Sequence, residues 1–158
     1  MKTATALAEA LAKAFDPPAS GFVGIVDNLL QLCRGGDMEL AWRSNACHVR
    51  IRQGTAEETL DLPLRKSVLR AMLARIAALC NQRQPGSVSP YGGRGEIHLG
   101  TDAHQAVIFA DFVNTAAQQS ARLAHLSHDG RAAADQAVGS GDVGSNPDVP
   151  PLRSRQSG

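Results

Sequence analysis

The sequence predicts an α+β domain in which an antiparallel sheet of about five to six strands is packed by two helices. Three observations carry this prediction: apolar residues recur at helical spacing in residues 21–34 and 64–81, and polar and apolar residues alternate within 37–62. The chain has 158 residues, 43% of them hydrophobic but only 4% aromatic. We therefore expect one domain with a largely aliphatic core.

The first segment, residues 3–15, is rich in alanine and leucine, and Leu7, Leu11 and Phe15 recur every four residues. This spacing predicts a short amphipathic helix that ends before Pro17 and Pro18. We expect residues 1–18 to be a helix and linker appended to the main domain, which spans 19–126.

The second helix is predicted for residues 21–34, because its large apolar residues fall on one face and Gly35-Gly36 then stops it. These residues are Phe22, Ile25, Val26, Leu29, Leu30 and Cys33.

Three strands are predicted next, at 37–42, 47–52 and 57–62, and they form an antiparallel meander. Ser44-Asn45 and Gln53-Gly54-Thr55 supply the turns between them.

The most regular helical pattern covers residues 64–81, and we expect this helix to pack on the sheet. Residues 84–95 hold two prolines and four glycines, which predicts a long loop. Two further strands are predicted at 96–99 and 105–113. The local pattern of 119–126 leaves helix and strand both open. After Ser127 the composition turns to Gly, Ser, Ala, Asp and Pro, which predicts a disordered tail over 127–158.

This order of elements resembles the PAS-like N-terminal domain that precedes the motor in type II secretion and type IV pilus assembly ATPases. That family shows a G-A-S-D-I-H-I-E-like strand, an R-x-R-x-D-G-like strand and turn, a helix with R-I-K and a loop of the form R-L-P-Q-D-G-R. The resemblance covers about residues 21–126 and lies in order and spacing. The matching stretches are Gly35-Gly36-Asp37-Met38-Glu39-Leu40, Val49-Arg50-Ile51-Arg52-Gln53-Gly54, Ala74-Arg75-Ile76-Ala77 and Tyr91-Gly92-Gly93-Arg94-Gly95-Glu96-Ile97.

The chain also departs from the family pattern. Met38-Glu39 replaces the Ile-His pair, Gln53 replaces the acid before Gly54, and the Pro-Gln-Asp before the loop arginine is lost. In the family this domain presents arginines towards nucleotide on the motor. The resemblance therefore implies Arg94, and after it Arg75 and Arg52, as residues that contact a partner protein or its bound phosphate.

No catalytic chemistry is predicted. The sequence holds no G-x-x-x-x-G-K-[ST] phosphate loop and no G-x-S-x-G nucleophile elbow, and Cys47 and His48 should point to opposite faces of a strand. Three cysteines among apolar neighbours, without C-x-x-C spacing, predict buried reduced thiols and no zinc site. We expect no cofactor and no metal.

Two functions remain open. The first is a non-catalytic protein-interaction domain related to the N-terminal domain of secretion and pilus ATPases, acting as an adaptor or regulator of such a motor. The second is a small-molecule sensor or secretion-chaperone-like domain, whose cavity would be lined by Trp42, Ile51, Met72 and Phe109. The net charge of +1 gives no case for a nucleic-acid partner. We expect a cytoplasmic protein without membrane insertion that binds a protein partner and is free to form homo-oligomers.

Overall fold

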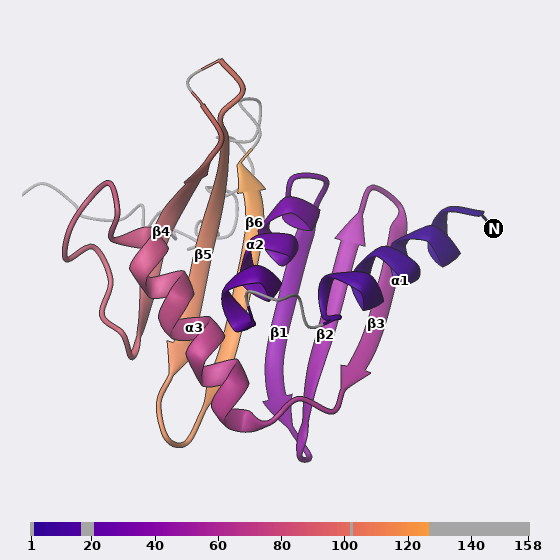
Figure 1. Ribbon diagram of the computed structural model, residues 1–158, viewed down its shortest axis with the longest axis horizontal. Helices are drawn as coiled ribbons and strands as arrows, with labels where there is room; N and C mark the ends of the chain where they lie inside the picture. The colour runs from indigo at the N-terminus through magenta and orange to yellow at the C-terminus, as the bar shows by residue number, and fades with distance from the viewer. Residues whose placement is uncertain (1, 17–20, 102, 127–158) are drawn as a thin grey trace, which may run out of the picture.

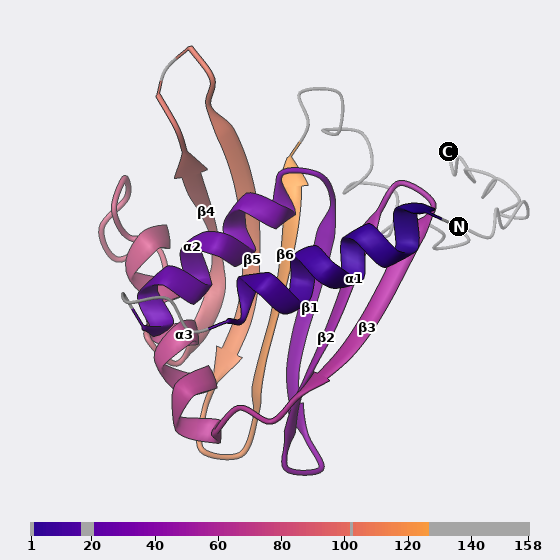
Figure 2. The same ribbon diagram turned by 45° about the vertical axis from the view of Figure 1, so that its right-hand side comes forward.

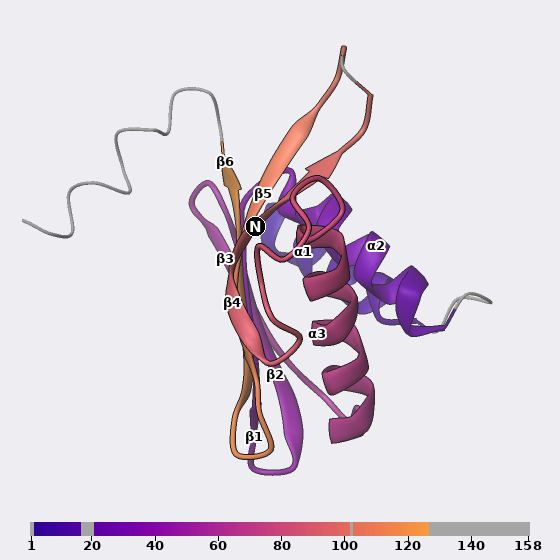
Figure 3. The ribbon, with the colours of Figure 1, turned by 90° about the vertical axis from the view of Figure 1, so that its left-hand side faces the viewer.

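The computed structural model describes residues 2–16, 21–101 and 103–126. Its helices and strands form two layers, with one sheet on one side and the helices on the other (Figures 1 and 3). The predicted α+β class and the antiparallel sheet are therefore confirmed. The predicted disordered tail at 127–158 and most of the linker before Ser20 lie outside the described residues. The elements are α1 (Lys2–Ala14), α2 (Phe22–Cys33), β1 (Asp37–Arg43), β2 (Ala46–Gln53), β3 (Ala56–Leu62), α3 (Lys66–Cys80), β4 (Gly92–Leu99), β5 (Ala106–Asn114) and β6 (Gln119–Leu126).

The sheet has six antiparallel strands in the order β3-β2-β1-β6-β5-β4. It consists of two meanders, one on each side of α3 in the sequence, and the β1–β6 pairing joins them. The segment 119–126, whose pattern left helix and strand open, is thus a strand in the middle of the sheet. Pairing on both sides decides its conformation, because a central strand satisfies its backbone groups through two neighbours.

The turns of the first meander follow the predicted chemistry. Ser44 and Asn45 both adopt positive φ, at 48° and 63°, as a two-residue hairpin turn that matches the twist of its strands requires. Gly54, with φ of 59°, turns the chain between β2 and β3. At the end of α2, a Cβ on Gly36 would lie 1.8 Å from the Arg52 carbonyl oxygen, so only glycine lets the chain pass β2 this closely.

All three helices cover the same face of the sheet, with α1 over β3, α2 over β6 and beside α3, and α3 over β4, β5 and β6 (Figures 2 and 3). The core between the layers contains the alternate residues Met38 and Leu40 of β1 and Cys47, Val49 and Ile51 of β2, all at most 1% exposed. Their helix-side partners include Leu29, Leu30, Leu69, Met72, Leu73 and Ile76.

The first helix is not an appendage, contrary to the expectation from its sequence. Leu7, Leu11, Ala14 and Phe15 are buried and belong to the same core cluster as the residues of α2 and β1. The reason is that the inward side of β3 needs a cover, and the predicted stripe on α1 supplies it.

The predicted loop 84–95 is four residues shorter at its end, because β4 begins at Gly92. Gly95 shows why glycine suits this strand. A Cβ at this position would lie 2.9 Å from the Cβ of Cys80, so the glycine lets α3 pack directly on β4. The buried Asn114 of β5 links α3 to the loop before β4, since its side-chain amide donates to the carbonyl oxygens of Arg70 and Pro90.

Candidate functional site

The face of the sheet that no described helix covers carries many charged side chains. We call it the uncovered face. Its residues alternate with the core residues along each strand, and the cross-strand register places them in rows. They include Asp37, Glu39, Ala41, His48, Arg50, Arg52, Glu57, Thr59, Asp61, Arg94, Glu96, His98, Val107, Phe109, Asp111, Val113, Ser120, Arg122 and Ala124.

One row crosses all six strands, and its charge alternates over the five strands from β2 to β4; we call it the ionic row. It runs Thr59, Arg50, Glu39, Arg122, Asp111, Arg94 from β3 to β4. Arg50 donates from Nη2 to Oε2 of Glu39 at 2.5 Å, and Arg94 donates from Nε to Oδ2 of Asp111 at 2.9 Å. The hydrogen bond and the charge of Glu39 raise the pKa of Arg50. Opposite charges directly across a strand pair stabilise the pairing.

Arg122 occupies the middle of the ionic row, between Glu39 and Asp111. The carboxylates of these neighbours already bind Arg50 and Arg94. The exposed Arg122 guanidinium thus lies at the centre of the face. There its N–H groups can donate hydrogen bonds to a carboxylate or phosphate of another molecule. The sequence analysis did not single out Arg122. The reason is that its position depends on 119–126 being a strand. Ala121 and Leu123 of this strand are buried, so Arg122 between them points to the other face.

An ion pair and a contact between a histidine and a carboxylate flank the row on its β2–β3 side. Arg52 Nε lies 4.0 Å from Glu57 Oε2, and His48 Nδ1 lies 2.5 Å from Asp61 Oδ1. A shallow hollow of about 560 Å³ lies over this half of the face. It is lined by Glu39, Leu40, Ala41, Arg43, Ser44, His48, Val49, Arg50, Glu57 and Thr59. This half therefore offers a depression lined by both acidic and basic side chains.

The structure separates the three arginines that the resemblance implied. Arg94 and Arg52 both lie on the uncovered face, but β4 and β2 are four strand spacings apart in the sheet, about 19 Å at the usual strand separation. Arg75 lies on α3, in the other layer, where its buried Nε has no hydrogen-bond partner among the described residues. One phosphate group cannot contact all three.

Arg94 also differs from the prediction in its setting, because it belongs to β4 and not to a flexible glycine loop. Its side chain is 74% exposed, and its Nε donates to Oδ2 of Asp111. A strand positions this guanidinium more rigidly than a loop would, so Arg94 remains the best placed of the three for contact with a partner.

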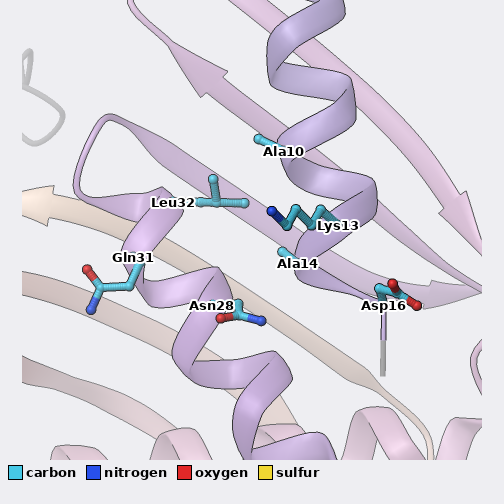
Figure 4. A pocket seen from close by; sticks show the side chains of 7 residues that line it. All are labelled: Ala10, Lys13, Ala14, Asp16, Asn28, Gln31 and Leu32. Carbon is cyan, nitrogen blue, oxygen red and sulfur yellow. The ribbon is translucent and has the colours of Figure 1, made fainter. Parts of the chain in front are cut away.

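A second candidate surface is a groove of about 480 Å³ between α1 and α2 (Figure 4). Figure 4 shows Lys13 of α1 extending towards Leu32 of α2 across the space between the two helices. The lining residues are Ala10, Lys13, Ala14, Asp16, Asn28, Gln31 and Leu32.

The cavity expected for a sensor is not built from the residues that suggested it. Ile51 and Met72 are fully buried between the layers, whereas Phe109 lies on the uncovered face. Because the sheet separates them, these side chains cannot line one cavity.

The thiols are buried and reduced, as predicted. Burial raises the pKa of Cys33 to about 12 and that of Cys47 to about 11, with smaller contributions from Asp37 and Asp61. Burial also raises the pKa of Cys80 to about 11. Cys47 faces the core while its neighbour His48 lies on the uncovered face, so the two do not form a nucleophile and base.

Within the described ranges, no group of three or more His, Cys, Asp or Glu residues is arranged to hold a metal ion. None of the helices in the described part of the chain is long and apolar enough to cross a membrane. Comparison of the chain with protein-family models and with curated proteins found no match.

Proposed function

We propose that this chain is a non-catalytic, cytoplasmic protein-interaction domain that binds a partner protein through the uncovered face of its sheet. The observation that supports the proposal is the ionic row with the exposed Arg122 at its centre. A sheet that exposes one face normally has polar residues there for solubility alone. Here the charges are ordered into cross-strand pairs, which fixes the positions of the guanidinium groups before a partner binds.

The resemblance to the N-terminal domain of secretion and pilus ATPases gives the partner: the motor subunit of such a system. The chain would act on it as an adaptor or regulator, and Arg94 would contact an acidic side chain or the phosphate of bound nucleotide. Arg52 lies on the same face, about four strands away, and would contact a different part of the partner. Arg75, in the helix layer, would not take part.

The test is the affinity of the purified chain for a secretion or pilus ATPase, measured by analytical ultracentrifugation at tens of micromolar. We expect a complex whose dissociation constant rises with salt, because surface ion pairs are screened. Charge reversal at the centre of the face, Arg122→Glu, should weaken it at least tenfold. No complex with any such ATPase, or ATP hydrolysis by the chain on its own, would overturn the proposal.

The second candidate function is a chaperone-like domain that holds a client segment, and the groove between α1 and α2 favours it. The variant Lys13→Glu in the lining of this groove separates the two functions. If binding uses the uncovered face, Lys13→Glu leaves the affinity unchanged while Arg122→Glu lowers it. If binding uses the groove, the two variants exchange effects.

A further inference from the structure

The strand β4 forms one edge of the sheet, and no described strand pairs with its outer side. It pairs with β5 from Gly92 to Leu99, while the described residues on its other side contribute one isolated bridge, between Ser89 and Gly92. The opposite edge, β3, carries three acids and no base in its seven residues. Charged residues of one sign oppose the addition of another strand. The two edges are therefore not equivalent.

The direction of the β4 backbone follows from two hydrogen bonds. Asn114 donates its N–H to the carbonyl oxygen of Tyr91 at 2.8 Å, so the odd-numbered residues of this register face β5. Bonded and non-bonded pairs alternate along an antiparallel ladder. The even-numbered residues must therefore direct N–H and C=O outward. Gly92 agrees, since its N–H bonds to Ser89 outside the sheet. Arg94, Glu96 and His98 present their backbone groups in the same direction.

A groove of about 300 Å³ runs along this edge, on the side of the molecule that Figure 3 turns towards the viewer. Its walls come from the end of α3 and the following loop on one side and from β4 on the other. The lining residues are Cys80, Arg83, Gln84, Ser87, Arg94, Gly95, Glu96, His98 and Phe109. The edge is thus accessible at the residues whose backbone groups point outward.

We propose that a second copy of this chain adds to this edge, β4 against β4 and antiparallel, about a twofold axis at Gly95. The dimer then has one continuous sheet of twelve strands, twice the six of one chain. Arg94 lies opposite Glu96 of the partner subunit, and the partner's Arg94 lies opposite Glu96. Each such pair also exchanges two backbone hydrogen bonds.

The register follows from backbone direction and charge. Only even-numbered residues present outward bonding groups, so Arg94 must lie opposite an even-numbered residue. Among such registers, two overlap seven of the eight residues of β4. The one centred on Glu96 places Glu96 opposite its own copy and Arg94 opposite the partner's His98. The one centred on Gly95 places opposite charges together twice. Like charges directly across strands destabilise and opposite charges stabilise, which selects the second register.

This inference does not depend on the proposed function, but it extends the same surface. A twofold axis perpendicular to the sheet keeps the helices of both copies on one side. The ionic row of one copy then continues from Arg94 into Glu96 of the partner subunit. The uncovered face becomes twice as wide.

The test is a charge swap measured by sedimentation equilibrium. The wild-type chain should reach twice its mass of 16.6 kDa at high concentration. Arg94→Glu and Glu96→Arg should each raise the dimer dissociation constant roughly tenfold, because each places like charges opposite one another twice. The double variant restores opposite charges and should return to within about threefold of wild type.

Two controls accompany the swap. Arg50→Glu reverses a charge in the same row but on β2, away from the edge, and should leave dimerisation unchanged. Glu96→Pro removes an N–H that β5 does not use and obstructs an added strand, so it should abolish the dimer while circular dichroism shows a folded monomer. A monomer at all concentrations, a double variant as weak as the singles, or masses that grow beyond the dimer would each overturn the proposal.

Discussion

The two faces of the sheet come from the same strands yet depend on opposite physical effects. On β1, Leu40 is 1% exposed in the apolar core, while its neighbour Glu39 lies on the uncovered face in an ion pair with Arg50. Removing apolar surface from water stabilises the covered face, whereas the uncovered face holds charges that water solvates nearly as well as their partners do. The covered face therefore carries most of the stability, and we propose that the ordered charges of the uncovered face serve recognition.

The largest change in the free energy of unfolding is expected from a substitution on the covered face. Leu40→Ala should lower the free energy of unfolding by about 2–5 kcal/mol, because it leaves a cavity between the layers. Urea denaturation followed by circular dichroism measures it. Thr59→Ala, in the ionic row on β3, is the matched control and should stay within about 0.5 kcal/mol of wild type. A cost below about 1 kcal/mol for Leu40→Ala would show that the two layers are not packed as described.

A change in stability of intermediate size is expected when the pH is raised, because the three thiols are buried. Folding raises the pKa of Cys33 to about 12 and of Cys47 and Cys80 to about 11 from an ordinary value of 9.0. The folded state therefore keeps these protons when the unfolded state loses them. The stabilisation is complete below pH 9 and is lost as the pH rises towards 11–12, with a slope approaching about 1.4 kcal/mol per pH unit for each thiol.

Urea titrations at pH 8, 9 and 10 measure this slope. Cys33→Ala should show a shallower loss, smaller by about 1 kcal/mol between pH 9 and 10, because one of the three linked groups is gone. Identical slopes for the variant and the wild type would contradict the burial of Cys33. At pH 8 a thiol reagent should label the native protein slowly and the urea-unfolded protein at all three cysteines.

The smallest change in stability is expected from a substitution on the uncovered face. Glu39→Gln removes the charge that binds Arg50 and should change the urea midpoint far less than Leu40→Ala, since both side chains are exposed. Any difference from wild type should vanish at about 1 M salt, where the screening length is about 3 Å. A salt-independent loss of stability would mean that the pair is more enclosed than its exposure indicates.

Local pattern predicted most of the elements correctly for a physical reason. The stripe of α3 and the alternation of β2 are properties of consecutive residues, and they report the period of each element directly. The turns at Ser44-Asn45 and Gly54 were equally local, because positive φ selects particular residue types. Of the three arginines that the resemblance implied, Arg94 and Arg52 lie on the uncovered face and Arg75 lies on α3, because sequence order does not show which layer of the fold a residue joins.

The sequence by itself determined which segments are helices, which are strands in the first meander and which side of each strand is apolar. Only the tertiary structure decided that 119–126 is a strand between β1 and β5, that α1 covers β3, and that Arg94 belongs to β4. It also decided that Arg50, Glu39, Arg122, Asp111 and Arg94 form one row. Periodicity extends over a few residues, whereas strand neighbours are set by which pairings together satisfy the backbone and bury the apolar faces of the whole chain.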